Sequence, residues 1–384
     1  MIKMIRILKK QIVLVISILL AFLSMAFIPP DRQYLAYPDF PALGILFCLM
    51  VVVAGFMEQR LFDFISAVLT AKSKSIKTLS VLLVNCVFFT SMFVTNDVTL
   101  IAFIPITIGV LSHAGQEKLI FVIVMETIAA NLGSMLTPIG NPQNLYLYSY
   151  FHIHILEFLK ITVPAGMTGY IIIMCIMLAS KNPSLDVSAV RNSPGENSLK
   201  SMDTGPRNKV ILWYYGGLFI LCILTVLNII DYRICFLLVL VSVVVFNRKL
   251  LKKVNYGLLM TFVSFFIFTG NVERMAAIKN AFSYFITGRA FIVSVLSSQV
   301  ISNLPSAMMI SRLTGDARGI LLGVNIGGLG TPVASLASLI SFGIYSRING
   351  SEPAKYWRVF AFFNVSILIF LVLIFSIYLN LMSF

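Results

Sequence analysis

Polar residues interrupt the apolar stretches of this chain, and one polar phrase occurs twice. Asn131 stands six residues before Thr137, and Asn325 stands six residues before Thr331; a proline follows each threonine. Asn, Gly and Pro break helices, and a helix broken inside a bilayer must satisfy its freed backbone groups elsewhere. Breaks that recur in corresponding halves of a membrane chain point to the binding site of a transporter.

A second polar phrase precedes each break: Thr95–Asp97 precedes the first and Ser302–Leu304 the second. Half-helix N-termini offer N–H donors and a positive dipole end, which suit an anion, whereas freed carbonyl oxygens suit Na⁺. The residues that we expect to bind the solute are Asn96, Asn141, Asn144, Ser302, Asn303, Thr331 and Pro332. The residues that we expect to ligate a cation are Thr95, Asn96, Asp97, Gly133, Thr137, Asn325 and Gly327. The alternative is that these small and polar residues only hold helices together.

The first of these phrases contains an acid. Asp97 has Leu304 as its counterpart in the second half. An acid inside a membrane is a functional candidate, because it is costly to bury there. As a carboxylate Asp97 would ligate Na⁺, and as a neutral acid it would carry H⁺; the structural alternative is a helix cap. Glu126, shortly before the first break, is the second buried-acid candidate.

The composition excludes a soluble protein. Of 384 residues, 59% are hydrophobic and 11% are charged, whereas soluble domains carry about 25% charged residues. The net charge of +14 fits basic cytoplasmic loops, so we expect no nucleic-acid partner. The five cysteines lie in apolar runs and the histidines lack zinc spacing, so we expect no metal beyond a possible Na⁺. Since the sequence contains neither a nucleotide-binding motif nor a nucleophile–base pair, we expect no enzyme activity and no cofactor apart from that ion.

Apolar stretches of about 20 residues predict membrane-spanning helices. We predict an all-α polytopic membrane protein with inverted structural repeats, about nine crossings, two re-entrant hairpins and two broken helices. The predicted segments are a first transmembrane helix in 1–39; repeat 1 over 40–180, with a hairpin at 76–112 and a broken helix at 117–150; a cytoplasmic linker over 181–209; a linking helix over 210–232; and repeat 2 over 233–384, with a hairpin at 290–313 and a broken helix at 317–346. The alternative for each hairpin is an ordinary kinked crossing.

Basic residues set the predicted orientation. With the N-terminus in the cytoplasm and both hairpins re-entrant, almost every basic cluster falls on the cytoplasmic side of the cell membrane. The basic start and the apolar run over 11–28 are also typical of a signal peptide, but more spans follow, so we expect an uncleaved first helix. Glu58–Lys77 and Glu273–Arg289 mix charged and apolar residues, and we expect interfacial helices on opposite faces.

At these motifs the chain resembles the ion-transporter superfamily, which includes arsenite permeases, Na⁺/H⁺ antiporters, citrate carriers and divalent anion/Na⁺ symporters. The similarity extends from about residue 40 to the end and rests on Thr95-Asn96-Asp97-Val-Thr99, Thr137-Pro-Ile-Gly-Asn-Pro-Gln-Asn144, Ser302-Asn303 and Gly330-Thr331-Pro332. It implies a scaffold domain, a transport domain that holds both hairpins, and usually a homodimer. In the divalent-anion branch a Ser-Asn-Thr tip in each hairpin binds substrate and sodium; here the Asn is kept in both tips, and Asp97 and Leu304 replace the Thr. The acid is more similar to the arsenite and Na⁺/H⁺ members.

The sequence therefore predicts a multi-pass secondary transporter that moves a small anion, a carboxylate or inorganic oxyanion, coupled to Na⁺ or H⁺. The alternative within transport is a Na⁺/H⁺ antiporter or an arsenite/antimonite efflux permease. Outside transport, the alternatives are an intramembrane enzyme and a receptor. The expected partners are a small anionic solute, the lipid bilayer and a second copy of the chain.

Overall fold

The computed structural model describes residues 12–62, 64–65, 73, 75–180 and 206–382, and the regular elements in these ranges are all helical. The first half contains α2 (Ile12–Met25), η1 (Arg32–Ala36), α3 (Phe40–Glu58), α5 (Ile76–Ser91), α6 (Asn96–Leu111), η2 (Ser112–Ala114), α7 (Gln116–Ser134), α8 (Pro142–Tyr150) and α9 (Ile155–Ala179). The second half contains α12 (Pro206–Val226), α13 (Tyr232–Asn247), η3 (Arg248–Lys253), α14 (Tyr256–Arg274), α15 (Ala276–Ile286), α16 (Ala290–Ile301), α17 (Asn303–Ser311), α18 (Ala317–Ile326), α19 (Leu336–Tyr345) and α20 (Pro353–Met382).

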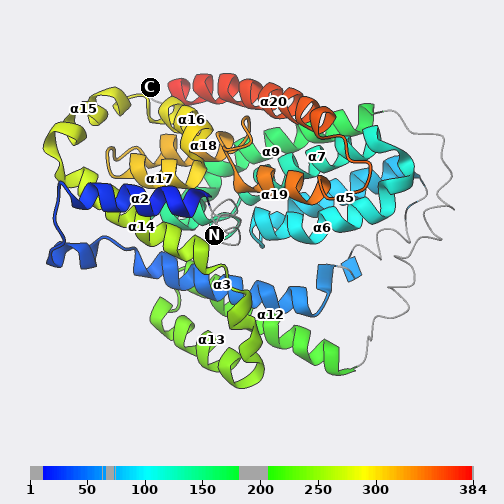
Figure 1. Ribbon diagram of the computed structural model, residues 1–384, viewed down its shortest axis with the longest axis horizontal. Helices are drawn as coiled ribbons and strands as arrows, with labels where there is room; N and C mark the ends of the chain where they lie inside the picture. Colours follow the sequence, from blue (N-terminus) through cyan, green and yellow to red (C-terminus); the bar gives the residue numbers. More distant parts are fainter. Residues whose placement is uncertain (1–11, 63, 66–72, 74, 181–205, 383–384) are drawn as a thin grey trace, which may run out of the picture.

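The helices form two packed groups (Figure 1). α3 packs against α12 and α13 on one side of the molecule, and α5, α6, α7 and α9 pack with α16, α18, α19 and α20 on the other. α2 lies along α14 between these groups. The first helix in the described part of the chain is thus placed beside a helix from the second half.

Five of the described helices are long and apolar enough to cross a membrane: Phe40–Glu58, Ile155–Ala179, Tyr232–Lys253, Tyr256–Arg274 and Pro353–Leu379. The described residues also include several shorter apolar helices, among them α5, α6, α18 and α19. A broken crossing contributes two short helices, and neither reaches the length of a full span. These helices make a polytopic membrane protein, and the total of nine crossings stays a prediction.

Two pairs of short helices occupy the ranges in which we expected hairpins. α5 and α6 are joined by residues 92–95, and α16 and α17 are joined at Ser302, which has a φ of 74°. The starts of α5 and of α7 both contact the end of α9, because Lys77 donates to the Leu178 carbonyl (2.5 Å) and Lys118 donates to the Ser180 hydroxyl (3.3 Å). Re-entry into the membrane and inverted orientation of the halves stay predictions.

The segments expected as arms differ in how much of each is described. α15 lies within 273–289, and its residues Lys279–Ile286 make an angle of 114° with α16. Residues 63, 66–72 and 74 of the other arm lie outside the described residues, as does 181–205 of the expected linker. The placement of the arms on opposite membrane faces therefore stays a prediction.

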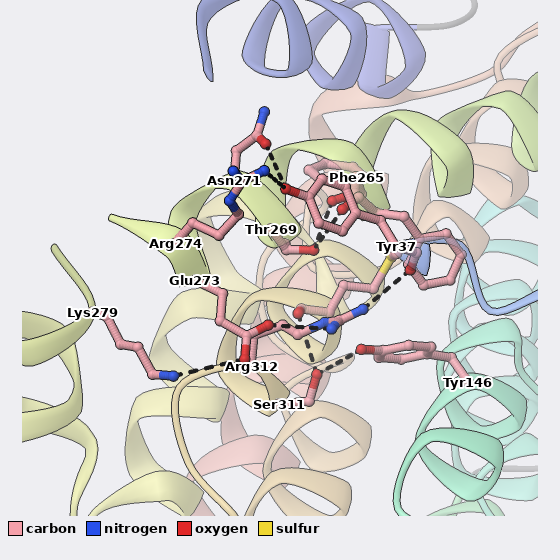
Figure 2. Close-up of polar contacts among 12 residues, drawn as sticks. Tyr37, Tyr146, Phe265, Thr269, Asn271, Glu273, Arg274, Lys279, Ser311 and Arg312 are labelled. Atoms are coloured by element: carbon pink, nitrogen blue, oxygen red, sulfur yellow. Dashed lines mark hydrogen bonds and ion pairs between the residues drawn. The ribbon is translucent and has the colours of Figure 1, made fainter. Parts of the chain in front are cut away.

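Arg312, at the end of α17, makes hydrogen bonds that connect the second hairpin to α14 and to the segment before α3 (Figure 2). Its guanidinium donates to the Glu273 carboxylate (3.2 Å) and to the Tyr37 carbonyl (3.1 Å). The guanidinium also lies 5.0 Å from the centre of the Tyr150 ring of α8. Glu273 accepts a second ion pair from Lys279 of α15 (3.7 Å). Four elements therefore meet at one side chain.

A second set of contacts at this end ties the N-terminal segment to α14. The Tyr37 hydroxyl donates to Asn271 Oδ1 and accepts from Arg274 Nη1, at 3.0 Å each. Arg274 also donates to the Asp31 carboxylate at 2.8 Å, and this hydrogen bond holds the pKa of Asp31 below its ordinary value. Side-chain hydrogen bonds and an ion pair thus hold the segment between α2 and α3 against α14.

Close packing of α5 on α7 requires a glycine just before the first break. A Cβ at Gly133 would lie 2.1 Å from the Phe88 carbonyl oxygen, far inside contact distance. We expect Gly133→Ala to destabilise the protein by about 1–3 kcal/mol, because overpacking forces the backbones apart. Thermal melting of the detergent-purified protein measures this. Gly109→Ala in α6 is the matched control, since its Cβ meets nothing within 4 Å; equal melting temperatures for the two variants would contradict the prediction.

Candidate functional site

Each hairpin tip lies against the break of its own half, and the hydrogen bonds correspond. The Asn96 N–H donates to the Gly140 carbonyl (3.3 Å), and the Asn303 N–H donates to the Ala334 carbonyl (3.0 Å). The side-chain oxygen of each asparagine accepts from the next N–H along the chain, at 2.9 Å in both halves. Each asparagine therefore satisfies groups at the start of a helix and in a break at the same time.

The threonines of the breaks correspond as well. The Thr137 hydroxyl donates to the Met92 carbonyl, and the Thr331 hydroxyl donates to the Gln299 carbonyl (2.9 Å). Both carbonyls lie at the end of the first arm of a hairpin, where helical partners run out. The repeated Thr thus binds the end of the arm beside it.

The two halves contact each other at the breaks. Asn131 Oδ1 accepts from the amide of Asn96 (2.9 Å) and from the hydroxyl of Ser335 (3.0 Å). In the other direction, the Asn325 amide donates to Asn144 Oδ1 at 2.6 Å. An asparagine of each break therefore makes a hydrogen bond to the other half of the chain, and these bonds bring the two breaks together.

A cavity of about 170 Å³ opens beside the two tips. Its polar lining includes Asn96, Asp97, Gln143, Ser302, Asn303 and Ser335. The opposite wall is made by Val13 and Leu14 of α2 and by Leu258 and Thr261 of α14. The cavity thus lies between the tips and the α2–α14 pair, and its size suits a small solute.

The residues that we expected to bind the solute fall into two groups. Asn96, Ser302 and Asn303 line the cavity, whereas Asn141, Asn144, Thr331 and Pro332 are not part of its lining. Asn144 instead binds backbone carbonyls of its own break, including that of Thr137 at 3.2 Å. The Thr331 N–H donates to the side chain of Gln299 at 2.9 Å. These residues shape the breaks in this conformation.

The expected cation ligands are spread over the cavity and the breaks. Asn96 and Asp97 line the cavity, whereas Thr95, Gly133, Thr137, Asn325 and Gly327 lie outside its lining. Gly327 serves close packing, since a Cβ there would lie 2.9 Å from the Ser298 side chain. Asn325 Oδ1 is buried and has no hydrogen-bond partner among the described residues. That oxygen is free to accept a further donor or a cation.

Asp97 does not act as a side-chain cap in this structure. Thr95 is the N-cap of α6 and makes no side-chain cap hydrogen bond, while the Asp97 N–H is satisfied by Asn96 Oδ1. Within the described residues, no hydrogen bond or ion pair to the Asp97 carboxyl was found. The acid therefore borders the cavity without a protein partner of its own.

Gln143 and Ser335 are cavity residues that the sequence reasoning missed. Gln143 is buried between the asparagines at 141 and 144, and its Nε2 has no acceptor among the described residues. Its position inside the first break was the available signal. The α2 and α14 residues carried no signal, because their sequence positions are ordinary for apolar helices.

Broken helices, paired tips and a small polar cavity inside a bundle of apolar helices define a multi-pass membrane transporter. The citrate transporter family (CitMHS) matches residues 2–320, so the chain belongs to that family, and its resemblance to the ion-transporter superfamily is confirmed. The family is one of transporters rather than enzymes.

Two relatives are similar to this chain over most of its length, and a third is similar over less than half of it. The uncharacterized transporter MJ0456 of Methanocaldococcus jannaschii is 32% identical over 303 residues, which cover 77% of this chain and 78% of that protein. The inner membrane protein YbiR of Escherichia coli is 24% identical over 369 residues, covering 95% and 93%. The silicon efflux transporter LSI3 of rice is 30% identical over 169 residues, covering 44% of this chain and 34% of LSI3.

We expect Gln143→Leu to weaken the binding of an anion to the cavity. The variant removes a buried donor, and a hydrogen bond to a charged group contributes about 1.5–3 kcal/mol, or about tenfold or more in affinity. A thermal-shift titration with citrate measures the loss. Gln33→Leu, at an exposed position of η1, is the matched control; identical titrations for the wild type and Gln143→Leu would show that Gln143 does not contact the anion.

Proposed function

We propose that the protein is a secondary active transporter that moves a small anion, a carboxylate or inorganic oxyanion, coupled to Na⁺ or H⁺ by alternating access. One observation carries the proposal. The two tip-and-break pairs make corresponding hydrogen bonds and meet at a single cavity. A site built from both halves at their junction changes its exposure when the halves move relative to each other.

The cavity chemistry favours an anion. α6 begins at Asn96 and α17 begins at Asn303, and both residues line the cavity. The N-termini of helices carry N–H donors and the positive end of the helix dipole. Amide and hydroxyl groups of Gln143, Ser302 and Ser335 add neutral donors. One acid, Asp97, belongs to this lining.

Asp97 is the proposed ion-coupling acid. As a carboxylate at the tip, it would bind Na⁺ together with freed backbone oxygens near Thr95 and the first break. As a neutral acid it would carry H⁺. The carboxyl borders the solute cavity, so binding of the ion and binding of the anion would favour each other by charge.

The proposal includes the orientation and assembly expected from the sequence. The N-terminus lies in the cytoplasm, and the second half is inverted relative to the first. α3, α12, α13 and α14 form the scaffold, the two hairpins and the two broken helices form the transport domain, and two copies pair in the membrane.

The alternative is a Na⁺/H⁺ antiporter or an arsenite/antimonite efflux permease. The acid at the first tip favours it, as does the relative from rice that is named as a silicon efflux transporter. Silicic acid and arsenous acid are neutral hydroxides, and the neutral amides and hydroxyls of the cavity would also bind them.

The two proposals are separated by ligand screening followed by transport. The purified protein is tested by thermal shift with citrate, phosphate and arsenite, each with and without Na⁺, because a ligand stabilises the state that it binds. Ligands that stabilise the protein are then tested for uptake into sealed proteoliposomes under Na⁺ or pH gradients. Uptake of citrate or phosphate supports the anion proposal. Transport of arsenite, or exchange of Na⁺ for H⁺, supports the alternative. If no ligand is transported under any gradient, both proposals are overturned.

We expect Asp97→Asn to change the ion dependence of transport more than the folding of the protein. Asn keeps the shape of the side chain and removes the charge, and the N–H of residue 97 keeps its hydrogen bond to Asn96 Oδ1, so little stability should be lost. Uptake at varied pH and Na⁺ concentration, compared with thermal melting, measures both effects. Asp316→Asn is the control, since Asp316 is exposed and caps α18 through a side chain that Asn can replace. Unchanged pH and Na⁺ dependence in Asp97→Asn would place the coupling site elsewhere.

A further inference from the structure

Glu126 lies in the middle of α7 and is completely buried. Its Oε1 accepts a hydrogen bond from the Thr107 hydroxyl of α6 at 2.5 Å. Its Oε2 is also buried and has no hydrogen-bond partner among the described residues. Glu126 is not part of the cavity lining, so the solute site does not use this acid.

Among the described residues, no ion pair to Glu126 was found. α7 packs against α5, α6, η2, α9, α18, α19 and α20, and the described titratable groups on which Glu126 acts electrostatically are Cys86 of α5 and Tyr356 of α20. A thiol and a phenol are neutral at neutral pH. A carboxylate buried without a cation is strongly disfavoured, and the group binds a proton instead. Glu126 is therefore a neutral acid in this conformation.

A second cavity, of about 310 Å³, lies against α6. Its lining includes Arg60 near the end of α3 and, on α6, Ile101, Ala102, Pro105 and Ile106. At about 100° per residue, these four positions of α6 face away from Thr107. α6 thus separates the second cavity from Glu126 by the thickness of one helix.

Pro105 weakens α6 at this point. Proline has no N–H, so the carbonyl four residues earlier, at Ile101, loses its helical partner, and the ring favours a bend. Ile101 is also a residue that lines the second cavity. A bend of α6 at Pro105 would move Thr107, the single described donor to Glu126, and would open the way from this cavity to the carboxyl.

We propose that Glu126 is a proton-binding site, separate from the solute cavity, that takes up and releases one proton in each transport cycle across the bend in α6. In uptake, a hydronium ion from the second cavity gives up one proton by breaking an O–H bond and leaves as water, while the carboxylate forms a new O–H bond with that proton; release reverses these steps. The inference rests on the proposed function and makes H⁺ a coupling ion. Asn131, five residues along α7, holds the first tip through Asn96, so α7 carries the state of the acid to the solute site.

Glu126→Gln tests the proposal because glutamine mimics the neutral acid and cannot release a proton. In wild-type proteoliposomes, infrared difference spectra between acidic and alkaline buffer should contain the C=O band of a protonated carboxyl that disappears reversibly at high pH. The band should be missing from Glu126→Gln. Glu117→Gln is the control, since it removes an exposed acid from the same helix and should leave the band unchanged. If Glu126→Gln does not fold, Thr107→Val replaces it and should shift the pH midpoint of the band.

Proton movement is measured in the same vesicles with a trapped pH dye, while citrate or arsenite is added as the transported probe. The wild type should move protons with the probe, and Glu126→Gln should bind the probe but lose its accumulation under a pH gradient. A carboxyl band that does not respond to pH, or a Glu126→Gln variant with normal proton-coupled transport, would overturn the proposal. If no probe is transported by the wild type, the proposed function fails, and the infrared titration still decides whether Glu126 exchanges its proton.

Discussion

Backbone groups freed by broken helices must find partners where lipid offers none, and this constraint governs the structure. The two hairpin tips and the two breaks satisfy each other. The Asn96 and Asn303 N–H groups bind carbonyls of the breaks, and the hydroxyls of Thr137 and Thr331 bind carbonyls of the hairpin arms. Because tip and break complete each other, they must lie together. The cavity arises where the two completed pairs meet.

The same constraint explains the close packing around the breaks. A hydrogen bond between a tip and a break requires their helices to approach closely, and side chains at the crossing would hold them apart. Gly133 lies on the Phe88 carbonyl, and Gly323 lies on the Phe291 carbonyl, so each half has a glycine where the broken helix crosses the first arm of its hairpin. The glycines at the crossings therefore allow the close approach that the hydrogen bonds between tips and breaks require.

The positions of the breaks could be predicted from the sequence, because Asn, Gly and Pro act locally on the backbone. The helices end within a few residues of the expected places, at Ser134 and Ile326. The direction of each side chain was not predictable. Asn144 and Thr331 lie in breaks as expected, yet they bind protein groups rather than lining the cavity. The spacing of residues along the sequence predicts which ones lie in a break, whereas the packing of the helices determines the direction of each side chain.

The wall opposite the tips was beyond sequence reasoning for a different reason. Leu14 and Thr261 come from α2 and α14, whose contact joins the start of the described chain to a helix of the second half. Nothing in an apolar helix specifies which other apolar helix it will pack against, since lipid and protein are similar partners for its surface. The number of crossings is likewise not fixed by hydropathy, because half-helices are too short to count.

The contacts of Arg312 link the second hairpin to α14, to α8 and to the segment before α3. Its guanidinium binds Glu273 and the Tyr37 carbonyl and lies over Tyr150, so one side chain depends on three elements besides its own. A largely buried cation deprived of its partners is strongly destabilised. A gradual slide of α17 along α14 would pass through such a state. Any motion of the second hairpin along α14 would therefore have to break all of these contacts together, so the Arg312 junction would oppose partial displacements of the hairpin.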